Sequence, residues 1–466
     1  MTPEQNNRTI CAIATAQGQG AIAVLRLSGS EAFRICEKIF IPMKEGKKLL
    51  LQKPNTIHFG QIVSNGEIID EVLVSLFKAP NSYTGEDVVE ISCHGSRFIQ
   101  QKILQLLIQN GASHAQAGEF TMRAFLNGKM DLSQAEAVAD LIASETDAAR
   151  RVAMRQMRGG FADELKGLRD EMVRFVSLME LELDFSEEDV EFADRNAFLI
   201  LISKIEKVIA RLTESFSFGN VLKNGVPVAI VGEPNVGKST LLNVLLNEER
   251  AIVSEIAGTT RDVIEDVIII DGFAFRFIDT AGIRHTHDIV ETLGIERTFD
   301  KIKNAAVVLL LVDARTEMEV MDKKIEELKE KISNNQKLVL VVNKTDLTEN
   351  LFCAFNNFEE KTDAIVFLSA KYKQNIDGLI DVLLTTVQNN NFHQNEVIVT
   401  NTRHYEALIQ TLNSIQNIKH GFQNQLATDL LTIDIRECLH HLGSITGEIT
   451  TDEILGNIFS KFCIGK

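Results

Sequence analysis

The sequence has no tryptophan and only six prolines among 466 residues. Long stretches are instead rich in Ala, Leu, Glu, Gln and Lys, a balance that favours helix and argues against an all-β architecture. Hydrophobic residues make up 45% of the chain, which is enough for a sizeable core. The composition predicts mixed α and β structure with a large helical part, and the length suggests about three domains.

Cysteine and positive charge are also scarce. The six cysteines form no C-x-x-C pair, so neither a disulfide framework nor a zinc cluster is indicated, and a reducing compartment fits. The 48 Lys and Arg against 65 Asp and Glu give a formal net charge of −17. Broad non-specific nucleic-acid binding needs a dense cationic surface and is not expected, although a local basic patch or a basic partner could still bring RNA to the chain.

The sequence shows no membrane segment and no secretory signal. The longest apolar run, residues 305–312, falls far short of the roughly 20 residues of a membrane helix. The N-terminal MTPEQNNRTI has no basic segment followed by an apolar one. We therefore expect a cytoplasmic protein that does not contact a membrane.

Three patterns of hydrophobic residues divide the chain. Residues 9–128 contain the extended runs TICAIAT, AIAVLRLSG, EVLVSLF and DVVEISCHG and two helical patterns, near 30–39 and 97–109, which predicts a compact α+β domain. From Val226 to near Val387, short apolar runs such as VPVAIVG and KLVLVVN alternate with helical segments, which predicts a mainly parallel sheet. Between them the spacing is helical, and the residues expected on one helix face are Leu165, Leu168, Met172, Val176, Met179 and Leu183.

Helical patterning resumes at Asn401, after the polar stretch QNNNFHQNE. Two helical tracts thus flank one α/β domain, and the economical interpretation is a domain inserted into a helical one, because insertions are tolerated where chain ends meet at a surface. Two separate helical domains are the alternative. The expected boundaries are 1–128 for the N-terminal domain, 129–219 and 389–466 for the two parts of the helical domain, and 220–388 for the inserted domain.

The sequence GEPNVGKS at residues 232–239 matches G-x-x-x-x-G-K-[ST] and lies between the run VPVAIV and the helical TLLNVLL. In such a loop the glycines let backbone N–H groups surround phosphates, Lys238 supplies charge to the β- and γ-oxygens, and Ser239 can bind Mg²⁺. In this context a loop of this form predicts a nucleotide site.

Two further motifs specify the base. NKTD, formed by Asn343, Lys344, Thr345 and Asp346, is an N-K-x-D pattern, and an Asp carboxylate can accept both N–H groups of the guanine Watson–Crick edge, which adenine cannot offer. SAK at residues 369–371 follows the next apolar run, where GTPases carry a loop that contacts guanine O6. An ATPase would leave Asp346 unexplained, so the motifs predict a GTPase.

The segment near the γ-phosphate lacks one expected residue. Thr260 in GTTRD and Asp279 in DTAGI are predicted to bind Mg²⁺, the second through water. Ile283 stands where small GTPases carry a glutamine that orients the attacking water. Asp288 and Glu291 are nearby acids that could take this role, and solvated acids at the start of a helix are the alternative.

The order GEPNVGKS, GTTRD, DTAGIR, VETLGIER and NKTD resembles the translation-factor-like GTPases that include Era, Der and MnmE. Outside the α/β domain, TGEDVVEISCHG at 84–95, AGEFTMRAFLNGKMDLSQAEAVADLI at 117–142 and FCIGK at 462–466 are similar to the tRNA modification GTPase (MnmE or TrmE) family. The resemblance spans nearly the whole chain. It implies a multidomain fold: an N-terminal α+β folate-binding and dimerisation domain, a helical domain and an inserted P-loop GTPase domain.

The resemblance also implies a reaction and partners. Members of this family couple GTP hydrolysis to the installation of a carboxymethylaminomethyl or aminomethyl group at C5 of the wobble uridine of certain tRNAs. They act with the flavoprotein MnmG (GidA), which contributes FAD and NADH, so the expected assembly is a homodimer within a heterotetramer of two plus two subunits. The alternative is a regulatory RNA- or ribosome-associated GTPase without a role in base modification. A second P-loop or a basic G-x-x-G loop would support it, and the sequence shows neither.

In the nucleotide site the resemblance implies a K⁺ ion in place of an arginine finger, and Glu291 as the residue that orients water. Asn235 matches the characteristic K⁺ ligand, although it could instead only brace the loop. The other implied K⁺ ligands are Ser254, Ile256 and Thr259, the Mg²⁺ ligands are Ser239, Thr260 and Asp279, and the catalytic residues are Glu291, Lys238, Asn235 and Cys463. The predicted GTP-binding residues are Asn235, Val236, Gly237, Lys238, Ser239, Thr240, Ser254, Glu255, Ile256, Ala257, Gly258, Thr259, Thr260, Asp279, Thr280, Ala281, Gly282, Asn343, Lys344, Asp346, Ser369, Ala370 and Lys371.

In the N-terminal domain the resemblance implies a site for 5-formyl- or 5,10-methylene-tetrahydrofolate. Arg26, Glu90, Lys129 and the terminal Lys466 match its binding positions; a carboxylate suits the pterin edge, and cations suit the glutamate tail. The loop AQGQGA before Arg26 departs from the Pro-Gly-Arg-Gly-Gly type of sequence frequent in the family. Cys463 matches a near-terminal cysteine considered for catalysis, and a buried or folate-proximal thiol without a catalytic role is the alternative.

Overall fold

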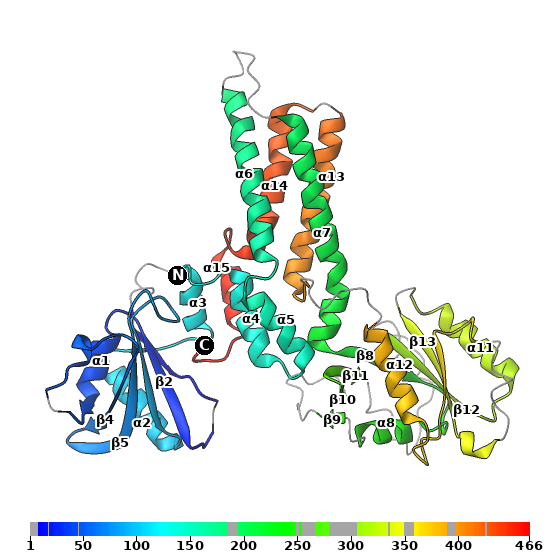
Figure 1. The fold of residues 1–466 in the computed structure, drawn as a ribbon, viewed down its shortest axis with the longest axis horizontal. Coiled ribbons are helices and arrows are strands. Elements are labelled where there is room, and N and C mark those ends of the chain that lie inside the picture. Colours follow the sequence, from blue (N-terminus) through cyan, green and yellow to red (C-terminus); the bar gives the residue numbers. More distant parts are fainter. Residues whose placement is uncertain are drawn as a thin grey trace. The chain divides into compact units, whose positions relative to one another are not determined.

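The computed structural model describes residues 8–16, 18–44, 46–184, 194–247, 251–253, 266–278, 305–333, 336–348, 358–388, 398–424 and 426–466. The chain forms two compact units (Figure 1). The first unit comprises 1–142, 156–202 and 413–466, and the second comprises 143–155 and 203–412. The long helices α7 (Arg195–Asn224) and α13 (Thr402–Gln423) contribute to both units.

The first unit contains a seven-stranded sheet in the order β3-β4-β5-β6-β2-β1-β7. Neighbouring strands are antiparallel except β1 and β7, which are parallel. The predicted extended runs form β1, β2, β5 and β6, whereas β3, β4 and β7 were not predicted. The strands are β1 (Ile10–Ile13), β2 (Ile22–Ser28), β3 (Phe40–Pro42), β4 (Thr56–Ser64), β5 (Glu67–Phe77), β6 (Val88–His94) and β7 (Ser113–His114).

The two faces of this sheet are covered unequally. Helices α1 (Ala32–Ile39) and α2 (Arg97–Gln109) pack on one face and enclose the main core of the domain. On the other face, Phe120 and Tyr83 pack against Ile10 of β1, with Phe120 supplied by helix α3 (Glu119–Leu126). The cover over β1 and β2 matters below, because a predicted site lies beneath it.

The C-terminal residues return to this sheet. Helices α3, α4 (Leu132–Ala143) and α15 (Asp452–Phe459) share a small core that includes Met122, Leu132 and Phe459. After α15 the chain forms an antiparallel bridge between Ile464 and Ala117. Residues more than 300 positions apart in the sequence therefore meet at the edge of the N-terminal domain.

Helices from both sides of the α/β segment pack together in the first unit. The ring of Phe198 on α7 lies 5.3 Å from Phe175 on α6 and 5.5 Å from Phe422 on α13, between ring centroids. Arg436 on α14 forms an ion pair with Glu180 on α6 at 2.6 Å. Such packing is expected if the α/β domain is inserted into a helical domain. The bounds are α6 (Ala162–Asp184) and α14 (Thr428–Thr446).

The predicted apolar face of the first long helix is confirmed for the residues whose side chains are described. The buried positions on α6 are Leu165, Leu168, Met172, Val176 and Met179. The side chain of Leu183 lies outside the described residues. Positions three and four apart meet on one helix face, so this stripe is what α6 buries against its neighbours.

As predicted, the second unit contains a mainly parallel sheet. Its strand order is β14-β13-β12-β8-β11-β10-β9. The strands from β14 to β11 are parallel, and β10 is antiparallel to both β11 and β9. β12 is buried from Val307 to Val312 because cores lie on both faces of the sheet, which explains its unbroken apolar sequence. The strands are β8 (Val226–Val231), β9 (Ala251–Val253), β10 (Asp266–Ile270), β11 (Phe273–Phe277), β12 (Val307–Asp313), β13 (Lys337–Asn343) and β14 (Ala364–Phe367).

Helices cover both faces of the parallel sheet. α8 (Lys238–Leu246) and α12 (Ile376–Gln388) contribute to one core, and α11 (Met318–Lys329) contributes to the other. The structure also describes η2 (Leu49–Leu51), η3 (Thr345–Leu347) and α5 (Asp147–Met157). The loops after the parallel strands all leave from one edge of the sheet, so motifs that follow different strands are brought together there.

Candidate functional site

The phosphate-loop motif connects β8 to the helix α8. Its two glycines are required by close packing: a Cβ on Gly232 would lie 2.3 Å from the carbonyl oxygen of Leu311, and one on Gly237 would lie 2.3 Å from Nδ2 of Asn343. Gly237 also has a φ of 104°, which side chains disfavour. The spacing of the glycines is therefore set partly by packing against β12 and β13.

Lys238 begins α8, and its ammonium group folds back over the loop. Its Nζ donates to the carbonyl oxygens of Gly232 at 2.5 Å and Glu233 at 2.9 Å. Ser239 lies in the first turn of α8, where the exposed N–H groups and the helix dipole favour anions. These donors and the lysine have the chemistry that a triphosphate requires.

Asn343 joins the phosphate loop to the predicted base-binding loops. Its side chain is buried at the end of β13. Nδ2 donates to the carbonyl oxygen of Val236 at 2.8 Å, and Oδ1 accepts from the backbone N–H of Ala370 at 2.9 Å. One side-chain amide therefore sets the relative positions of all three loops.

Asp346 is oriented by Ser369, whose hydroxyl donates to Oδ1 of Asp346 at 2.6 Å. Two backbone hydrogen bonds between Ser369 and Gln374, at 3.1 and 3.0 Å, close the loop that contains Lys371. The ammonium group of Lys371 lies 5.0 Å from the ring centroid of Tyr372. A carboxylate held in this way can accept the two parallel N–H groups of guanine.

Lys344 reaches from the base-binding motif to the phosphate loop. Its Nζ donates to the carbonyl oxygen of Asn235 at 2.8 Å. Asn235 is exposed and has a φ of 64°, and Lys344 has a φ of 63°. Both residues are in the left-handed region, so surrounding contacts must hold them there.

Other predicted residues of the nucleotide site lie outside the described residues: Ser254, Glu255, Ile256, Ala257, Gly258, Thr259, Thr260, Asp279, Thr280, Ala281, Gly282 and Glu291. Ile283 and Asp288 lie outside them as well. The described part of the site is thus the phosphate loop with the two loops predicted to bind the base.

A second cluster lies on the N-terminal sheet, where β2 and β6 place Arg26 directly opposite Glu90. Nε and Nη2 of Arg26 lie 2.9 and 2.8 Å from Oε1 of Glu90. The guanidinium group also lies over the rings of Tyr83 and Phe120, at 5.3 and 5.7 Å from their centroids. Charge, a carboxylate and two aromatic faces are therefore gathered at one place.

The C-terminal tail lies against this cluster. Nη1 of Arg26 donates to the carbonyl oxygen of Gly465 at 3.5 Å, and the backbone N–H of Phe120 donates to the carbonyl of Lys466 at 3.2 Å. Three of the four predicted folate residues, Arg26, Glu90 and Lys466, are thus brought together. The fourth, Lys129, bonds the carbonyl oxygen of Pro80 instead, at 2.9 Å.

A buried polar network beside this cluster was not predicted. Arg123 on α3 bridges Glu119 and Glu86, at 3.1 and 3.2 Å, and both Arg123 and Glu119 are almost completely buried. Arg8 forms a second ion pair with Glu119 at 3.0 Å, and Ser28 donates to Glu86 at 2.6 Å. The four-residue spacing of Glu119 and Arg123 on one helix face was the available signal.

The cysteines differ in exposure. Cys463 in the C-terminal tail is exposed, and its carbonyl oxygen accepts from the backbone N–H of Gly118 at 3.5 Å. Burial raises the pKa of the Cys11 and Cys438 thiols to about 12 and that of Cys93 to about 11. Burial also raises the pKa of Cys36. Among the described cysteines, Cys463 is therefore the one open to reagents, and Cys353 lies outside this set.

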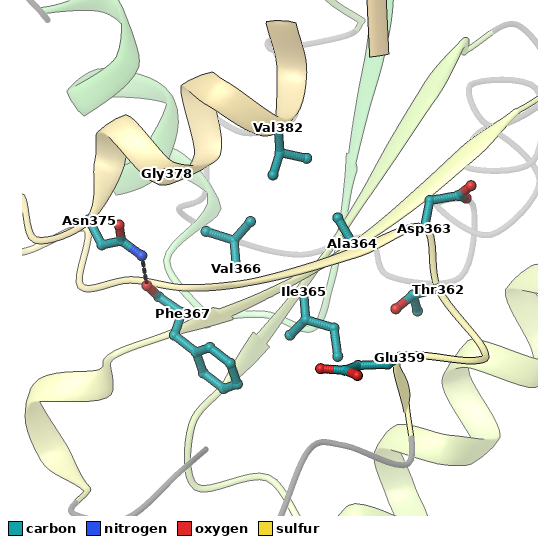
Figure 2. A pocket seen from close by; sticks show the side chains of 10 residues that line it. All are labelled: Glu359, Thr362, Asp363, Ala364, Ile365, Val366, Phe367, Asn375, Gly378 and Val382. Carbon is teal, nitrogen blue, oxygen red and sulfur yellow. Dashed lines mark hydrogen bonds between the residues drawn. The ribbon is translucent and has the colours of Figure 1, made fainter. Parts of the chain in front are cut away.

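A separate hollow of about 600 Å³ runs along β14, the edge strand of the parallel sheet (Figure 2). Its lining includes Ile365 and Val366 of β14, Val382 of α12 and the acidic Glu359. The side-chain amide of Asn375 donates to the carbonyl oxygen of Phe367 at 2.7 Å beside it. Among the residues that the structure describes, no predicted site residue lines this hollow.

Two known protein families match parts of this chain. Residues 9–129 match the N-terminus of the GTP-binding protein TrmE, and residues 132–463 match the MnmE helical domain. In the described part of the chain, no helix is both long and apolar enough to cross a membrane.

Full-length relatives agree with these matches. Three proteins named tRNA modification GTPase MnmE are 55% identical in Flavobacterium johnsoniae, 54% in Flavobacterium psychrophilum and 56% in Bacteroides thetaiotaomicron. The alignments cover 98–99% of this chain and 99–100% of each relative. Among solved structures, the G domain of the T. maritima FeoB iron transporter is 22% identical, over 35% of this chain and 99% of that one, with a TM-score of 0.26 that supports no further conclusion.

Proposed function

The chain belongs to the MnmE (TrmE) family of tRNA modification GTPases, and from this membership we propose how its GTP hydrolysis serves tRNA modification. We propose that it acts with a flavoprotein of the MnmG type to install a carboxymethylaminomethyl or aminomethyl group at C5 of the wobble uridine. The partner supplies FAD and NADH, and the expected assembly is two plus two subunits. The compartment in which tRNA is modified, the cytoplasm, is the expected location.

One observation carries the assignment of the nucleotide. Ser369 holds Asp346 by a 2.6 Å hydrogen bond, and Asn343 ties the same group of loops to the phosphate loop. A carboxylate fixed in a loop that is tied to the phosphate loop can discriminate guanine from adenine, because adenine lacks the pair of N–H groups.

Mg²⁺ and K⁺ are proposed cofactors, and the chemistry of the described donors fits both ions. The hydroxyl of Ser239 is a hard oxygen ligand at the start of α8, as Mg²⁺ prefers. Asn235 is exposed on the phosphate loop and offers an amide oxygen, which suits a large monovalent cation. When bound there, K⁺ would supply positive charge near the β/γ bridge, and Glu291 is proposed to orient the attacking water.

Hydrolysis measured in K⁺ and in Na⁺ tests the cation. We expect much faster GTP hydrolysis by the full-length protein in K⁺, and an Asn235→Ala variant that hydrolyses GTP equally slowly in both salts while still binding GDP. Equal rates in both salts for the unaltered protein would rule out the K⁺ role.

Nucleoside analysis of tRNA from a deletion strain tests the biological role. We expect the wobble uridine to lose its C5 substituent, and complementation with the gene to restore it. Normal modification in the deletion strain would instead favour a regulatory GTPase that binds RNA or ribosomes.

The cluster around Arg26 is proposed to bind 5-formyl- or 5,10-methylene-tetrahydrofolate. Glu90 can accept the N–H groups of the pterin edge, and Arg26 can stack or pair with the ligand because it already lies over two aromatic rings. Lys466 lies at the same place through its backbone, and Lys129 would have to exchange its bond to Pro80 for a ligand carboxylate.

The open face of the N-terminal sheet is the proposed homodimer surface. Over β4 and β5 it carries exposed large apolar side chains, including Ile57, Phe59 and Leu73. Phe59 and Leu73 are direct cross-strand partners, and Ile41 and Ile22 extend the patch onto β3 and β2. An apolar face of this kind marks an interface, and a second copy can cover it by twofold symmetry.

The proposed domain boundaries are those expected from the sequence: 1–128, 129–219 with 389–466, and 220–388. In this organisation the GTPase domain is inserted between the two helical parts. Packing of Phe198 between rings from both parts supports it.

A further inference from the structure

Asp313 is a partly buried carboxylate that the sequence motifs did not single out. It ends β12, and the parallel register places it beside Asn343, at the end of β13. The backbone N–H of Ala314 donates to the carbonyl of Asn343 at 2.8 Å, which holds the two strand ends together. Asp313 therefore lies at the same sheet edge as the base-binding motif.

The carboxylate of Asp313 forms ion pairs with two cationic side chains that differ in exposure. Oδ2 lies 2.9 Å from Nζ of Lys344, which also bonds the carbonyl of Asn235 at 2.8 Å. Arg315 donates from Nε and Nη2 to the two oxygens at 2.9 and 2.8 Å, but its side chain is 59% exposed, whereas that of Asp313 is 14% exposed. Arg315 is a surface partner, and Lys344 is a partner inside the nucleotide site.

The same contacts keep Asp313 ionised. Hydrogen bonds from Arg315 and then from Lys344 hold the pKa of this carboxyl well below its usual range, despite partial burial. A fixed negative charge is thus present beside Lys344 throughout the physiological pH range.

We propose that Asp313 is a positioning residue for nucleotide binding, which holds Lys344 so that its ammonium group braces Asn235 in the phosphate loop. The inference rests on the proposed guanine-nucleotide site and extends it. Asp313 contacts neither base nor phosphate in this role; it acts through Lys344.

Two physical reasons favour this role. A lysine side chain has many rotamers, and ordering it before the ligand arrives removes that entropy cost from binding. Asn235 and Lys344 both have a positive φ, a conformation that needs support from neighbours. The Asp313–Lys344–Asn235 chain supplies that support, and it connects the base-binding loop to the residue proposed to hold K⁺.

The test uses the full-length protein and the probe GDP, titrated as a fluorescent derivative in Na⁺ buffer. We expect Asp313→Asn to weaken GDP binding about tenfold, which corresponds to about 1.4 kcal/mol. The K⁺ concentration for half-maximal GTP hydrolysis should rise severalfold, while kcat at saturating GTP and K⁺ stays within about twofold.

Arg315→Ala is the matched control, because it removes the other partner of the same carboxylate. We expect its GDP affinity to stay within about twofold of the unaltered protein. In a Lys344→Met background, Asp313→Asn should change GDP affinity by less than about twofold, because the residue through which it acts is gone.

Unchanged GDP binding by Asp313→Asn, or an effect of equal size in the Lys344→Met background, overturns the inference. If the Asn variant does not fold, Asp313→Glu gives the same decision: weaker binding supports the role and unchanged binding removes it. Failure of the unaltered protein to bind GDP would instead be a failure of the proposed function.

Discussion

The nucleotide site and the Arg26 cluster are built in different ways. In the nucleotide site, loops at the ends of neighbouring parallel strands are tied through backbone groups, such as the carbonyls of Val236 and Asn235. In the Arg26 cluster, two side chains on neighbouring strands pair with each other, and the carbonyl of Gly465, 439 positions from Arg26, completes the cluster. A site whose residues belong to short motifs is specified by short stretches of sequence, whereas a site made of side chains outside such motifs depends on how the whole domain folds.

This difference has a consequence for substitution. In the nucleotide site one carboxylate, that of Asp346, is proposed to recognise the base, so its replacement should have a large effect on discrimination between bases. In the Arg26 cluster several groups are proposed to share the binding, so each substitution should have a smaller effect. The following experiments test that contrast, from the largest expected effect to the smallest.

Asp346→Asn should weaken GTP binding by about a thousandfold, because the amide presents an N–H to a guanine N–H and leaves that guanine N–H without an acceptor. The same change should improve binding of xanthosine triphosphate, whose C2 carbonyl can accept that N–H. Nucleotide titration of the full-length variant measures both. Folate binding should be unaffected, and a GTP affinity close to that of the unaltered protein would contradict the assignment of Asp346.

Phe59→Asp should weaken the homodimer about a hundredfold, because it places a charge in the proposed apolar interface. Size-exclusion chromatography with light scattering over a range of concentrations measures the change. Leu51→Asp is the control, because Leu51 is 79% exposed on the η2 turn and does not belong to the sheet face. Persistence of the dimer in Phe59→Asp would remove this face as the dimer surface.

Glu90→Gln should weaken binding of 5-formyl-tetrahydrofolate about tenfold, because it replaces a charged acceptor by a neutral one and removes the charge partner of Arg26. Calorimetric titration measures the affinity. GDP binding should not change, and Glu67→Gln at the exposed start of β5 serves as the control. If Glu90→Gln bound folate as well as the unaltered protein, the cluster would not be the pterin subsite.

Alkylation at pH 8 should modify Cys463 before the other described cysteines, because it is exposed, whereas burial raises the pKa of Cys11 and Cys438 to about 12 and of Cys93 to about 11. Peptide mass spectrometry over time measures the order. GTP hydrolysis should change by less than about twofold, because Cys463 lies in the C-terminal tail against Gly118 of the N-terminal domain and is not part of the GTPase motifs. Modification of Cys11 or Cys93 at the same rate would show that the N-terminal sheet opens.

Strands and helices could be predicted from the sequence where burial places apolar residues at a regular spacing. The continuous apolar runs of β12 and β13 indicated strands covered on both faces, and the stripe that includes Met172 and Val176 indicated one buried helix face. β4 was not predicted because exposed positions of this strand, Ile57 and Phe59, are apolar. Its sequence, TIHFGQIVS, therefore lacks the alternation of apolar and polar residues that marks a strand with one exposed face. Such a face defeats a rule that expects polar residues outward.

Whether a site residue could be named from the sequence depended on related reasons. Asn343 and Asp346 could be named because short loops place them, and hydrogen bonds to Val236 and Ser369 are consistent with that placement. Asp313 could not, because an acid at the end of a strand has no motif until the neighbouring strand is known. The Arg123 network was missed because its partners come from three separated segments.

By itself, the sequence determined the order of the GTPase motifs, the βα alternation that carries them, and the family, because these depend on residues close together in the chain. Only the tertiary structure decided that Arg26 meets Glu90 and Gly465, that Asp313 meets Lys344, and that apolar side chains on β4 and β5 of the N-terminal sheet are left exposed. Pairing of distant side chains follows from strand register and domain closure, and a one-residue change in register would place the same residues on opposite faces.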